Sequence, residues 1–347
     1  MSMKIAPRKR TALLSFLVLL HVIVFFAGFV APYDPIQQDR DRPYAPPAAV
    51  HFWDAQGKFH GRPFVYAQRV KEGSFDQYED DRTTRMPIKF FVSGASYRLF
   101  GIIPGNLHLF GAEARKVNLL GTDGFGRDLF SRILFGGQIS LLAGLLAASI
   151  SLLIGTVVGS ASGYFGGWAD SIAMRLAELC LALPWLYLLF GLRAFLPLLV
   201  SPVKAFLVVV ITIGALGWAR PARLVRGIAL SAKERDFVRA ARGFGASDPY
   251  ILTRHILPQT KSVILTQAAL LIPQYVLAEV TLSFLGLGIP EPAPSWGNLL
   301  SNLQQFSVLS SYWWMYLPAL AMVPFFFGYL ALSSTLQEEP RASKIDL

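Results

Sequence analysis

The sequence predicts an all-α polytopic membrane protein with six transmembrane helices and an irregular or small β insertion outside the membrane. Of its 347 residues, 53% are hydrophobic and only 16% are charged, whereas soluble domains carry about 25% charged residues. Apolar runs of about 20 residues recur along the chain, long enough to cross the hydrocarbon core at about 1.5 Å per helical residue. The six runs are 12–31, 139–159, 172–195, 203–218, 262–287 and 313–333.

The chain has a formal net charge of +10. Nucleic-acid binding would explain such a charge, but lysines and arginines also gather on the cytoplasmic loops of membrane proteins. The second explanation needs no nucleic acid, and we expect none as a partner. The single cysteine, Cys180, lies inside an apolar run, which excludes an internal disulfide and a cysteine metal cluster.

The first apolar run follows a basic segment that contains Lys4, Arg8, Lys9 and Arg10. This run is longer than the apolar part of a signal peptide, about 7–15 residues, and no clean cleavage site precedes Pro32. We therefore expect a retained first helix with a cytoplasmic N-terminus. Six crossings would return the C-terminus to the cytoplasm. The predicted parts are the N-terminus with the first helix (1–31), an extracytoplasmic segment (32–137), a five-helix core (138–336) with a cytoplasmic loop (220–261), and a cytoplasmic tail (337–347).

The extracytoplasmic segment is polar and rich in proline, which argues against a continuing helix. Within it, the aromatic runs 51–53 and 64–66 flank turn residues and predict a small β-hairpin. Residues 88–103 are apolar but form a short stretch that carries Lys89 and Arg98. We predict that this stretch is interfacial or packed and does not span the membrane.

Small residues recur at every fourth position of the second apolar run: Ser151, Gly155, Gly159 and Gly163. This spacing puts them on one helix face and predicts a seam where two backbones approach closely, although glycine is generally frequent in membrane helices. Acidic residues inside apolar runs are costly and are candidates for function. Glu178 and Glu279 are two such residues, with a pathway or packing role and a substrate-catching role both open.

The loop 220–261 carries nine basic residues against three acidic ones, in agreement with a cytoplasmic location. Ser231 followed by Glu234 is a capping-box pattern and predicts the start of a short helix. In that helix, four apolar residues would form one stripe, and Gly243 with Gly245 would end it. The stripe consists of Phe237, Ala240, Ala241 and Phe244.

A second short helix is predicted to start at Ser247-Asp248-Pro249 and to end at Pro258. An apolar stripe in a cytoplasmic loop allows two interpretations. One is a helical knob inserted into a groove of a soluble partner. The other is a basic amphipathic helix that lies on anionic lipid.

Several motifs in the expected order resemble a known family. Arg239-Ala240-Ala241, Gly245 and 256–258 resemble the EAA loop of inner-membrane permeases in binding-protein-dependent ABC importers. The motifs GTDGFGRD (121–128), GYFGGW (163–168), LSFLGLG (282–288) and PSWG (294–297) resemble the second permease subunit of the dipeptide, oligopeptide and nickel branch. The resemblance covers 121 to about 336. Two departures are Arg239, where the family usually has Glu, and the long outer segment 39–116, which many relatives lack.

The resemblance implies a type I ABC importer permease fold, in a bacterial inner membrane, that forms half of a translocation pore. It implies a second homologous permease, two ATP-binding subunits and an extracytoplasmic substrate-binding protein as partners, with membrane lipid around the helices. Di- or oligopeptides are the expected substrates, and nickel chelates or oligosaccharides are alternatives. The residues implied in coupling to the ATPase are Phe237, Arg239, Ala240, Ala241, Phe244, Gly245, Asp248 and His255.

The chain itself lacks the motifs of a catalytic subunit. Its one Gly-Lys pair, Gly57-Lys58, is followed by Phe59 and does not form a phosphate-binding loop. The five histidines show no metal-ligand spacing, and no G-x-S-x-G nucleophile motif occurs. We therefore expect a non-enzymatic chain with no cofactor or metal of its own, while the partner ATPase binds ATP and Mg²⁺. The alternative from another class is an ATP-independent transporter or channel whose basic loop binds lipid.

Overall fold

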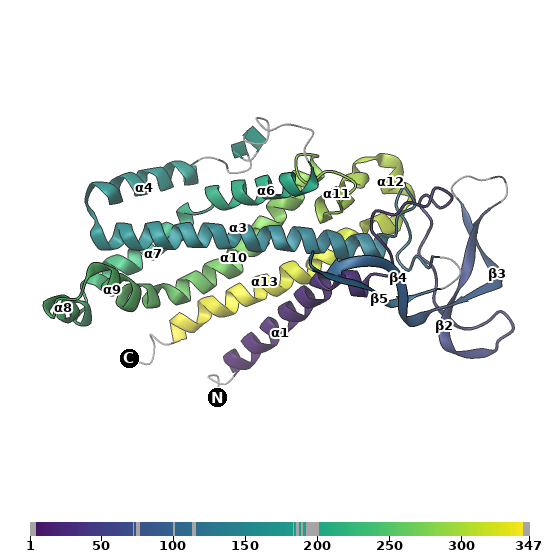
Figure 1. Cartoon of the computed structure of the whole chain (residues 1–347), viewed down its shortest axis with the longest axis horizontal. Helices are drawn as coiled ribbons and strands as arrows, with labels where there is room; N and C mark the ends of the chain where they lie inside the picture. Colours follow the sequence, from purple (N-terminus) through teal and green to yellow (C-terminus); the bar gives the residue numbers. More distant parts are fainter. Residues whose placement is uncertain are drawn as a thin grey trace. The chain divides into compact units, whose positions relative to one another are not determined.

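The structure is a computed structural model that describes residues 5–71, 73, 77–99, 101–112, 116–182, 184, 187–188, 190–191 and 201–342. The chain divides into two units, shown in Figure 1. The helical unit comprises residues 1–16, 141–282 and 326–347. The mixed unit comprises residues 17–140 and 283–325 and contains the sheets.

Four stretches are long and apolar enough to cross a membrane: Leu129–Phe165, Pro202–Lys233, Asp248–Phe284 and Trp313–Gln337. These four stretches contain, or largely cover, four of the six apolar runs that the sequence predicts as spans. The first predicted run, 12–31, falls on two helices, α1 (Ile5–Phe25) and α2 (Ala27–Val30). Neither helix is among the four candidate membrane spans. The third run begins in α4 (Gly167–Ala182), and most of its second half lies outside the described residues.

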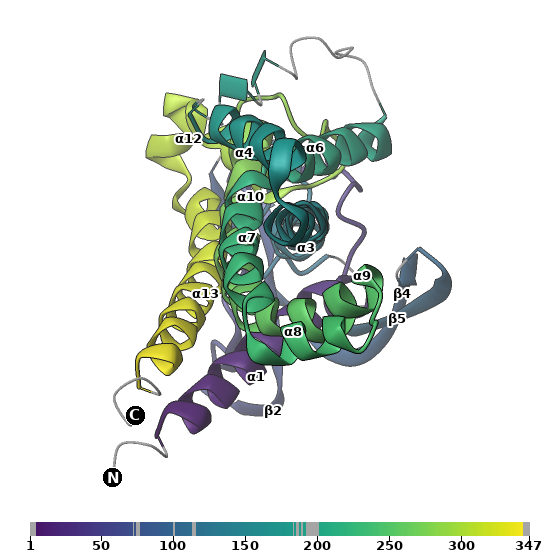
Figure 2. The same ribbon diagram turned by 90° about the vertical axis from the view of Figure 1, so that its left-hand side faces the viewer.

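The helical unit is built around α3, whose 37 residues correspond to about 55 Å of helix. Figure 2 shows the other helices gathered around α3, with α8 and α9 beside its C-terminal end. The central helix α3 runs from Leu129 to Phe165. The other helices are α4 (Gly167–Ala182), α6 (Pro202–Leu216), α7 (Ala219–Lys233), α8 (Asp236–Gly243), α9 (Asp248–Ile251), the π-helical turn η1 (Leu252–Ile256), and parts of α10 (Leu257–Phe284) and α13 (Leu317–Ala342).

The small residues of α3 lie against the start and middle of α7. A Cβ added at Gly155 would lie 2.7 Å from the Cβ of Pro221, and one at Gly163 would lie 2.7 Å from the Cβ of Ala229. At Gly159 an added Cβ would collide with the carbonyl oxygen of Ala222. The two backbones therefore approach more closely than any larger residue would permit.

Two predicted helix boundaries in loop 220–261 are wrong. Ser231 does not start a helix, because α7 continues to Lys233 with Ala229 and Ala232 fully buried. Pro258 does not end a helix, because α9, η1 and α10 are continuous. The Leu257 N–H donates to the Leu252 carbonyl, an i→i+5 bond that widens the turn just before the proline. Such a π-turn lets a helix pass a residue that has no N–H.

Two small antiparallel sheets form the first part of the mixed unit. β1 (His51–Trp53), β2 (Phe59–Val70) and β3 (Tyr78–Pro87) form one sheet, with His51 paired to Phe64. β4 (Lys89–Leu99) and β5 (Ile103–Gly111) form the other. The stretch 88–103 is thus mainly a strand. A core of Val65, Ala67, Met86, Ile88 and Phe110 lies beneath these strands.

The second part of the mixed unit is made of short helices: α11 (Trp296–Ser301), η2 (Asn302–Gln304), α12 (Phe306–Ser311) and η3 (Trp313–Tyr316). Ser295 and Asn298 form a capping box at the start of α11. The Trp296 indole is 2% exposed and donates to the Ile133 carbonyl at 3.1 Å. The PSWG motif therefore fixes α11 against the first turns of α3.

Candidate functional site

Residues 234–256, here called the knob, form a compact projection between α7 and α10. Arg235 has extended backbone angles and precedes α8, whose first turn carries Asp236. Gly245 has a φ of +81°, a left-handed conformation that glycine adopts without steric cost. Ser247 then precedes α9, with a proline in the first turn. The predicted break at Gly245 and the restart at Asp248 are both confirmed.

The inner face of the knob is a small apolar core. Val238 and Ile251 are 1% and 0% exposed, and they pack with Tyr164 of α3 and with Ala229 and Ala232 of α7. Ala241, from the predicted stripe, also packs against this core. The knob is therefore held against the ends of α3 and α7 and is not a free loop.

The outer face of the knob carries exposed aromatic side chains. Phe244 is 93% exposed, Tyr250 is 52% exposed and Phe237 is 39% exposed. The ring of His255 lies 5.8 Å from that of Phe237 and 5.7 Å from that of Tyr250, measured between centroids. Two predicted coupling residues, Phe237 and His255, thus lie together with Tyr250, which the sequence pattern did not single out. Ala240, also exposed, leaves room for close approach.

Polar contacts tie the knob to α3. The Tyr164 hydroxyl donates a short hydrogen bond to the Asp248 carboxylate. The Arg242 guanidinium donates to the Tyr164 oxygen at 3.1 Å and lies over the Tyr164 ring, 5.6 Å from its centroid. This hydrogen bond raises the pKa of Arg242. Sequence reasoning included Asp248 but missed Tyr164, which stands in the GYFGGW motif.

An ion pair joins α4 to α7. The Arg226 guanidinium binds the Asp170 carboxylate with two contacts of 2.6 Å each. Paired contacts of this kind fix geometry as well as charge. Asp170 lies two residues after the GYFGGW motif. Tyr164 before the α3–α4 turn and Asp170 after it therefore both bind other parts of the helical unit.

Arg239 forms an ion pair with Glu234 at 3.3 Å. Both side chains are about two thirds exposed, 65% and 64%. Exposed pairs of this kind contribute little stability, so Arg239 is available to a partner. Arg235 and Arg254 are also exposed on the knob. The knob therefore exposes four arginines, Arg242 included, and three acidic residues, Glu234, Asp236 and Asp248.

The two acidic residues predicted inside spans differ in environment. Glu178 is exposed on α4 within the single chain. Glu279 is fully buried in α10. Gly155, Gly159 and Gly163 belong to the α3–α7 seam described above. Among the described residues, no cluster of three or more His, Cys, Asp or Glu side chains is placed to bind a metal.

Asp123 and Arg127 of the GTDGFGRD motif join Arg132 and the half-exposed Glu291 in a charge network of the mixed unit that sequence reasoning did not find. Arg127 binds Asp123 at 2.7 Å and Glu291 at 2.6 Å, while Arg132 binds Glu291 at 2.9 Å. Both arginines are at most 3% exposed. The neighbouring Asp128 is also buried, and burial raises its pKa. Two guanidiniums and two carboxylates compensate one another, as buried charges require.

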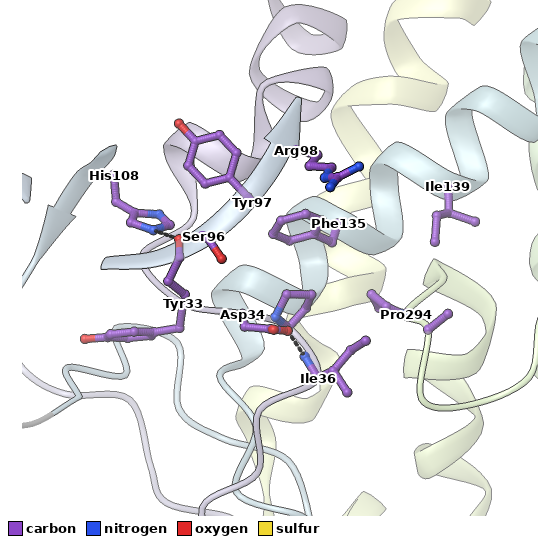
Figure 3. Close-up of a pocket in the computed structure, with 13 residues that line it drawn as sticks. Tyr33, Asp34, Ile36, Ser96, Tyr97, Arg98, His108, Phe135, Ile139 and Pro294 are labelled. Carbon is purple, nitrogen blue, oxygen red and sulfur yellow. Dashed lines mark hydrogen bonds between the residues drawn. The ribbon is translucent and has the colours of Figure 1, made fainter. Parts of the chain in front are cut away.

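A pocket of about 320 Å³ opens elsewhere in the mixed unit (Figure 3). Its walls come from the segment after α2, the β4–β5 hairpin, the first turns of α3 and the loop before α11. The side chains that face it combine polar and apolar groups. They include Tyr33, Asp34, Ile36, Ser96, Tyr97, Arg98, His108, Phe135, Ile139 and Pro294.

Comparison with known proteins agrees with the motifs. The chain is 38% identical over 219 residues to the dipeptide transport system permease protein DppC of Bacillus subtilis, a match that covers 63% of this chain and 66% of that protein. It is 39% identical over 197 residues to a putative peptide permease protein of Brucella suis, covering 57% of this chain and 63% of that protein. These matches span slightly less than two thirds of either relative.

An amino acid ABC transporter crystallised with histidines is 20% identical, with a TM-score of 0.43, and the match covers 61% of this chain and 94% of that one. That likeness is too distant to support an argument. The family match is direct: residues 151–337, more than half of the chain, match the family described as the binding-protein-dependent transport system inner membrane component. The chain therefore belongs to this family of inner-membrane transport components.

Proposed function

We propose that this chain is the permease subunit of an ATP-driven, binding-protein-dependent importer of di- or oligopeptides. The observation that carries the proposal is the knob. Its inner face is packed against α3 and α7 and hydrogen-bonded to α3, while Phe237, Phe244 and Tyr250 are exposed on the knob. A firmly held helical projection with exposed aromatic side chains suits a groove on a soluble partner.

The proposed partner at the knob is an ATP-binding subunit that binds ATP and Mg²⁺. The chain itself is non-catalytic. Two such subunits and a second homologous permease complete the membrane complex, and an extracytoplasmic binding protein delivers the substrate. The topology that goes with this assembly has six spans, both termini in the cytoplasm, and residues 32–137 on the outer side.

The peptide substrate is inferred from relatives named as dipeptide and peptide permeases. ATP hydrolysis reaches the pore because the knob prefers one conformation of the ATPase, so that closure of the ATPase shifts the permease between its two access states. The knob would then move as one body with the ends of α3 and α7.

Reconstitution tests the proposal. The full chain is co-expressed with its partner ATPase, second permease and binding protein, and the purified complex is placed in liposomes. We expect ATP-dependent uptake of labelled dipeptide, with none when the catalytic site of the ATPase is inactivated. Nickel chelate and oligosaccharide are tested in parallel. ATP-independent uptake by this chain alone, with no ATPase in the purified material, would contradict the proposal and favour a lipid-bound loop.

A further inference from the structure

We infer that the pocket in the mixed unit binds a small zwitterion, with Arg98 receiving its carboxylate and Asp34 its ammonium group. The inference rests on the proposed function only for the choice of a short peptide as ligand. The pocket lies wholly within one unit of this chain. Part of its wall comes from the β4–β5 hairpin, inside the 39–116 segment whose role the sequence left open.

The two charged groups reach the pocket from different elements. Arg98 extends from β4, and Asp34 stands in the segment after α2, on the other side of Phe135 in Figure 3. Among the described residues, no ion pair joins either side chain to a partner. The Asp34 carboxylate accepts one local bond, from the Ile36 N–H at 2.8 Å. A pocket that has one positive and one negative side chain, with no ion pair between them, suits a ligand that carries both a carboxylate and an ammonium group.

Three other polar side chains of the pocket already contact the protein, whereas the Ser96 hydroxyl faces the pocket as well (Figure 3). The Tyr97 hydroxyl donates to the Leu107 carbonyl at 2.8 Å, and the Tyr33 oxygen accepts the Val117 N–H at 2.6 Å. The two ring nitrogens of His108 lie against the carbonyl oxygens of Ala31 and Ala95. Arg98 and Asp34 are therefore the charged groups of the lining with spare bonding capacity, and Ser96 adds a neutral hydroxyl.

The same contacts make the pocket rigid. His108 is 4% exposed and connects the β4–β5 hairpin to the end of α2. A wall that is fixed before binding loses little freedom when a ligand enters. The β4–β5 hairpin therefore provides a fixed strand from which the exposed Arg98 side chain reaches the pocket, while the exposed Asp34 comes from the segment after α2.

The remaining wall is apolar and sets the kind of side chain that fits. Phe135 and Ile139 project from α3, and Pro294 faces them from the loop before α11. The volume of about 320 Å³ lies at the small end of ligand pockets. An amino acid or short peptide with an apolar side chain has this combination of size, two charges and an apolar surface.

The test uses the full chain in detergent and the dipeptide Ala-Phe as the probe, followed by ligand-observed NMR titration. N-acetyl-Ala-Phe lacks the ammonium group, and Ala-Phe amide lacks the carboxylate. We expect each modified peptide to bind at least about tenfold more weakly than Ala-Phe, the loss of one charge-assisted contact. Equal binding of the three peptides, or no saturable binding of Ala-Phe up to about 10 mM, would overturn the inference.

Two variants assign the charges separately. Arg98→Gln is expected to abolish the preference for Ala-Phe over its amide and to keep the preference over the acetylated form. Asp34→Asn is expected to do the reverse. Arg82→Gln and Asp80→Asn change exposed charges on β3, outside the pocket, and should leave both preferences intact. If Arg98→Gln and Asp34→Asn left both preferences intact, the assignment would be wrong.

A free amino acid and a dipeptide both carry a free ammonium group and a free carboxylate. Phenylalanine is therefore titrated in parallel with Ala-Phe, and the ligand that binds more tightly shows whether the pocket prefers an amino acid or a peptide. The experiment contains neither ATP nor a binding protein. Its outcome is thus separate from that of the uptake assay. Binding without ATP-driven uptake would leave the pocket assigned and the proposed function refuted, and uptake without binding would do the opposite.

Discussion

The hydroxyl of Tyr164, at the end of α3, donates a hydrogen bond to the carboxylate of Asp248, the first residue of α9. This bond crosses from the proposed ATPase-binding knob to α3. Arg242 of α8 holds the same oxygen from the other side at 3.1 Å. Both short helices of the knob thus meet one hydroxyl group on α3. This contact and the apolar core beside it join the knob to α3, so the proposed coupling to the ATPase would reach α3 by this route.

Removal of that hydroxyl should uncouple hydrolysis from transport. In Tyr164→Phe the ring keeps its place in the apolar core, while Asp248 and Arg242 lose their shared partner. We expect transport per ATP hydrolysed to fall at least about fivefold, the size of an ordinary coupling energy between sites. The measurement is uptake and ATPase rate in the same liposomes.

Tyr316→Phe is the matched control. It removes another tyrosine hydroxyl, one that donates to the Leu309 carbonyl at 2.9 Å in the mixed unit. We expect no change in the ratio of transport to hydrolysis. An unchanged ratio in Tyr164→Phe as well would show that the hydroxyl has no part in coupling.

Arg239→Glu should alter ATPase coupling more than membrane insertion. The variant loses the exposed 3.3 Å ion pair with Glu234 and places two like charges side by side. Because that pair is exposed, the effect on folding should stay within about 1 kcal/mol, whereas the charge offered to the partner is reversed. Transport and ATPase rates of the complex are compared with the amount of chain in the membrane. Unchanged rates for both would refute a partner contact at Arg239.

The sequence was informative where structure depends on composition and local turn chemistry. Four apolar runs are recognisable spans because crossing a membrane requires only length and hydropathy. The break at Gly245 and the restart at Asp248 also follow from local rules for helix ends. The seam glycines were visible because their spacing repeats every fourth residue.

The sequence was misleading where tertiary contacts override local rules. Ser231 has the sequence pattern of a helix start. However, α7 continues beyond Ser231 because Ala229 and Ala232 are buried on its inner face. Pro258 ends no helix because a π-turn precedes it. The Tyr164–Asp248 bond spans 84 positions and the Arg127–Glu291 bond spans 164. No local pattern connects such partners, so these contacts were out of reach.

The close packing of α3 against α7 predicts that alanine substitutions at two glycines will have different effects on stability. In Gly159→Ala the new methyl group would collide with the Ala222 carbonyl, so we expect a loss of about 1–3 kcal/mol of stability, as for other overpacked interiors. Gly227 lies within α7 and has nothing within 4 Å of the position of an added Cβ. Gly227→Ala should be neutral or stabilising by about 0.5–1 kcal/mol. Unfolding in detergent measures both, and equal effects would mean that the seam is not close-packed.

The β1–β2 turn predicts a pH dependence in the mixed unit. The Asp54 carboxylate contacts His60 at 2.8 Å and Arg85 at 2.9 Å, and it accepts the Lys58 N–H at 2.9 Å. The hydrogen bond from His60 and those from the backbone lower the pKa of Asp54 from 3.8 to about 2. Because the folded pKa is lower, this stabilisation is complete above pH 3.8 and is lost as the pH falls towards 2.

Asp54→Asn should therefore be less stable than the natural chain at pH 6, and the difference should shrink between pH 4 and about 2. Thermal unfolding of both full chains in detergent across this range gives the comparison. Asp80→Asn, an exposed carboxylate on β3, serves as the control and should show little difference at any pH. A gap between Asp54→Asn and the natural chain that stays constant down to pH 2 would mean that the Asp54 charge does not stabilise this turn.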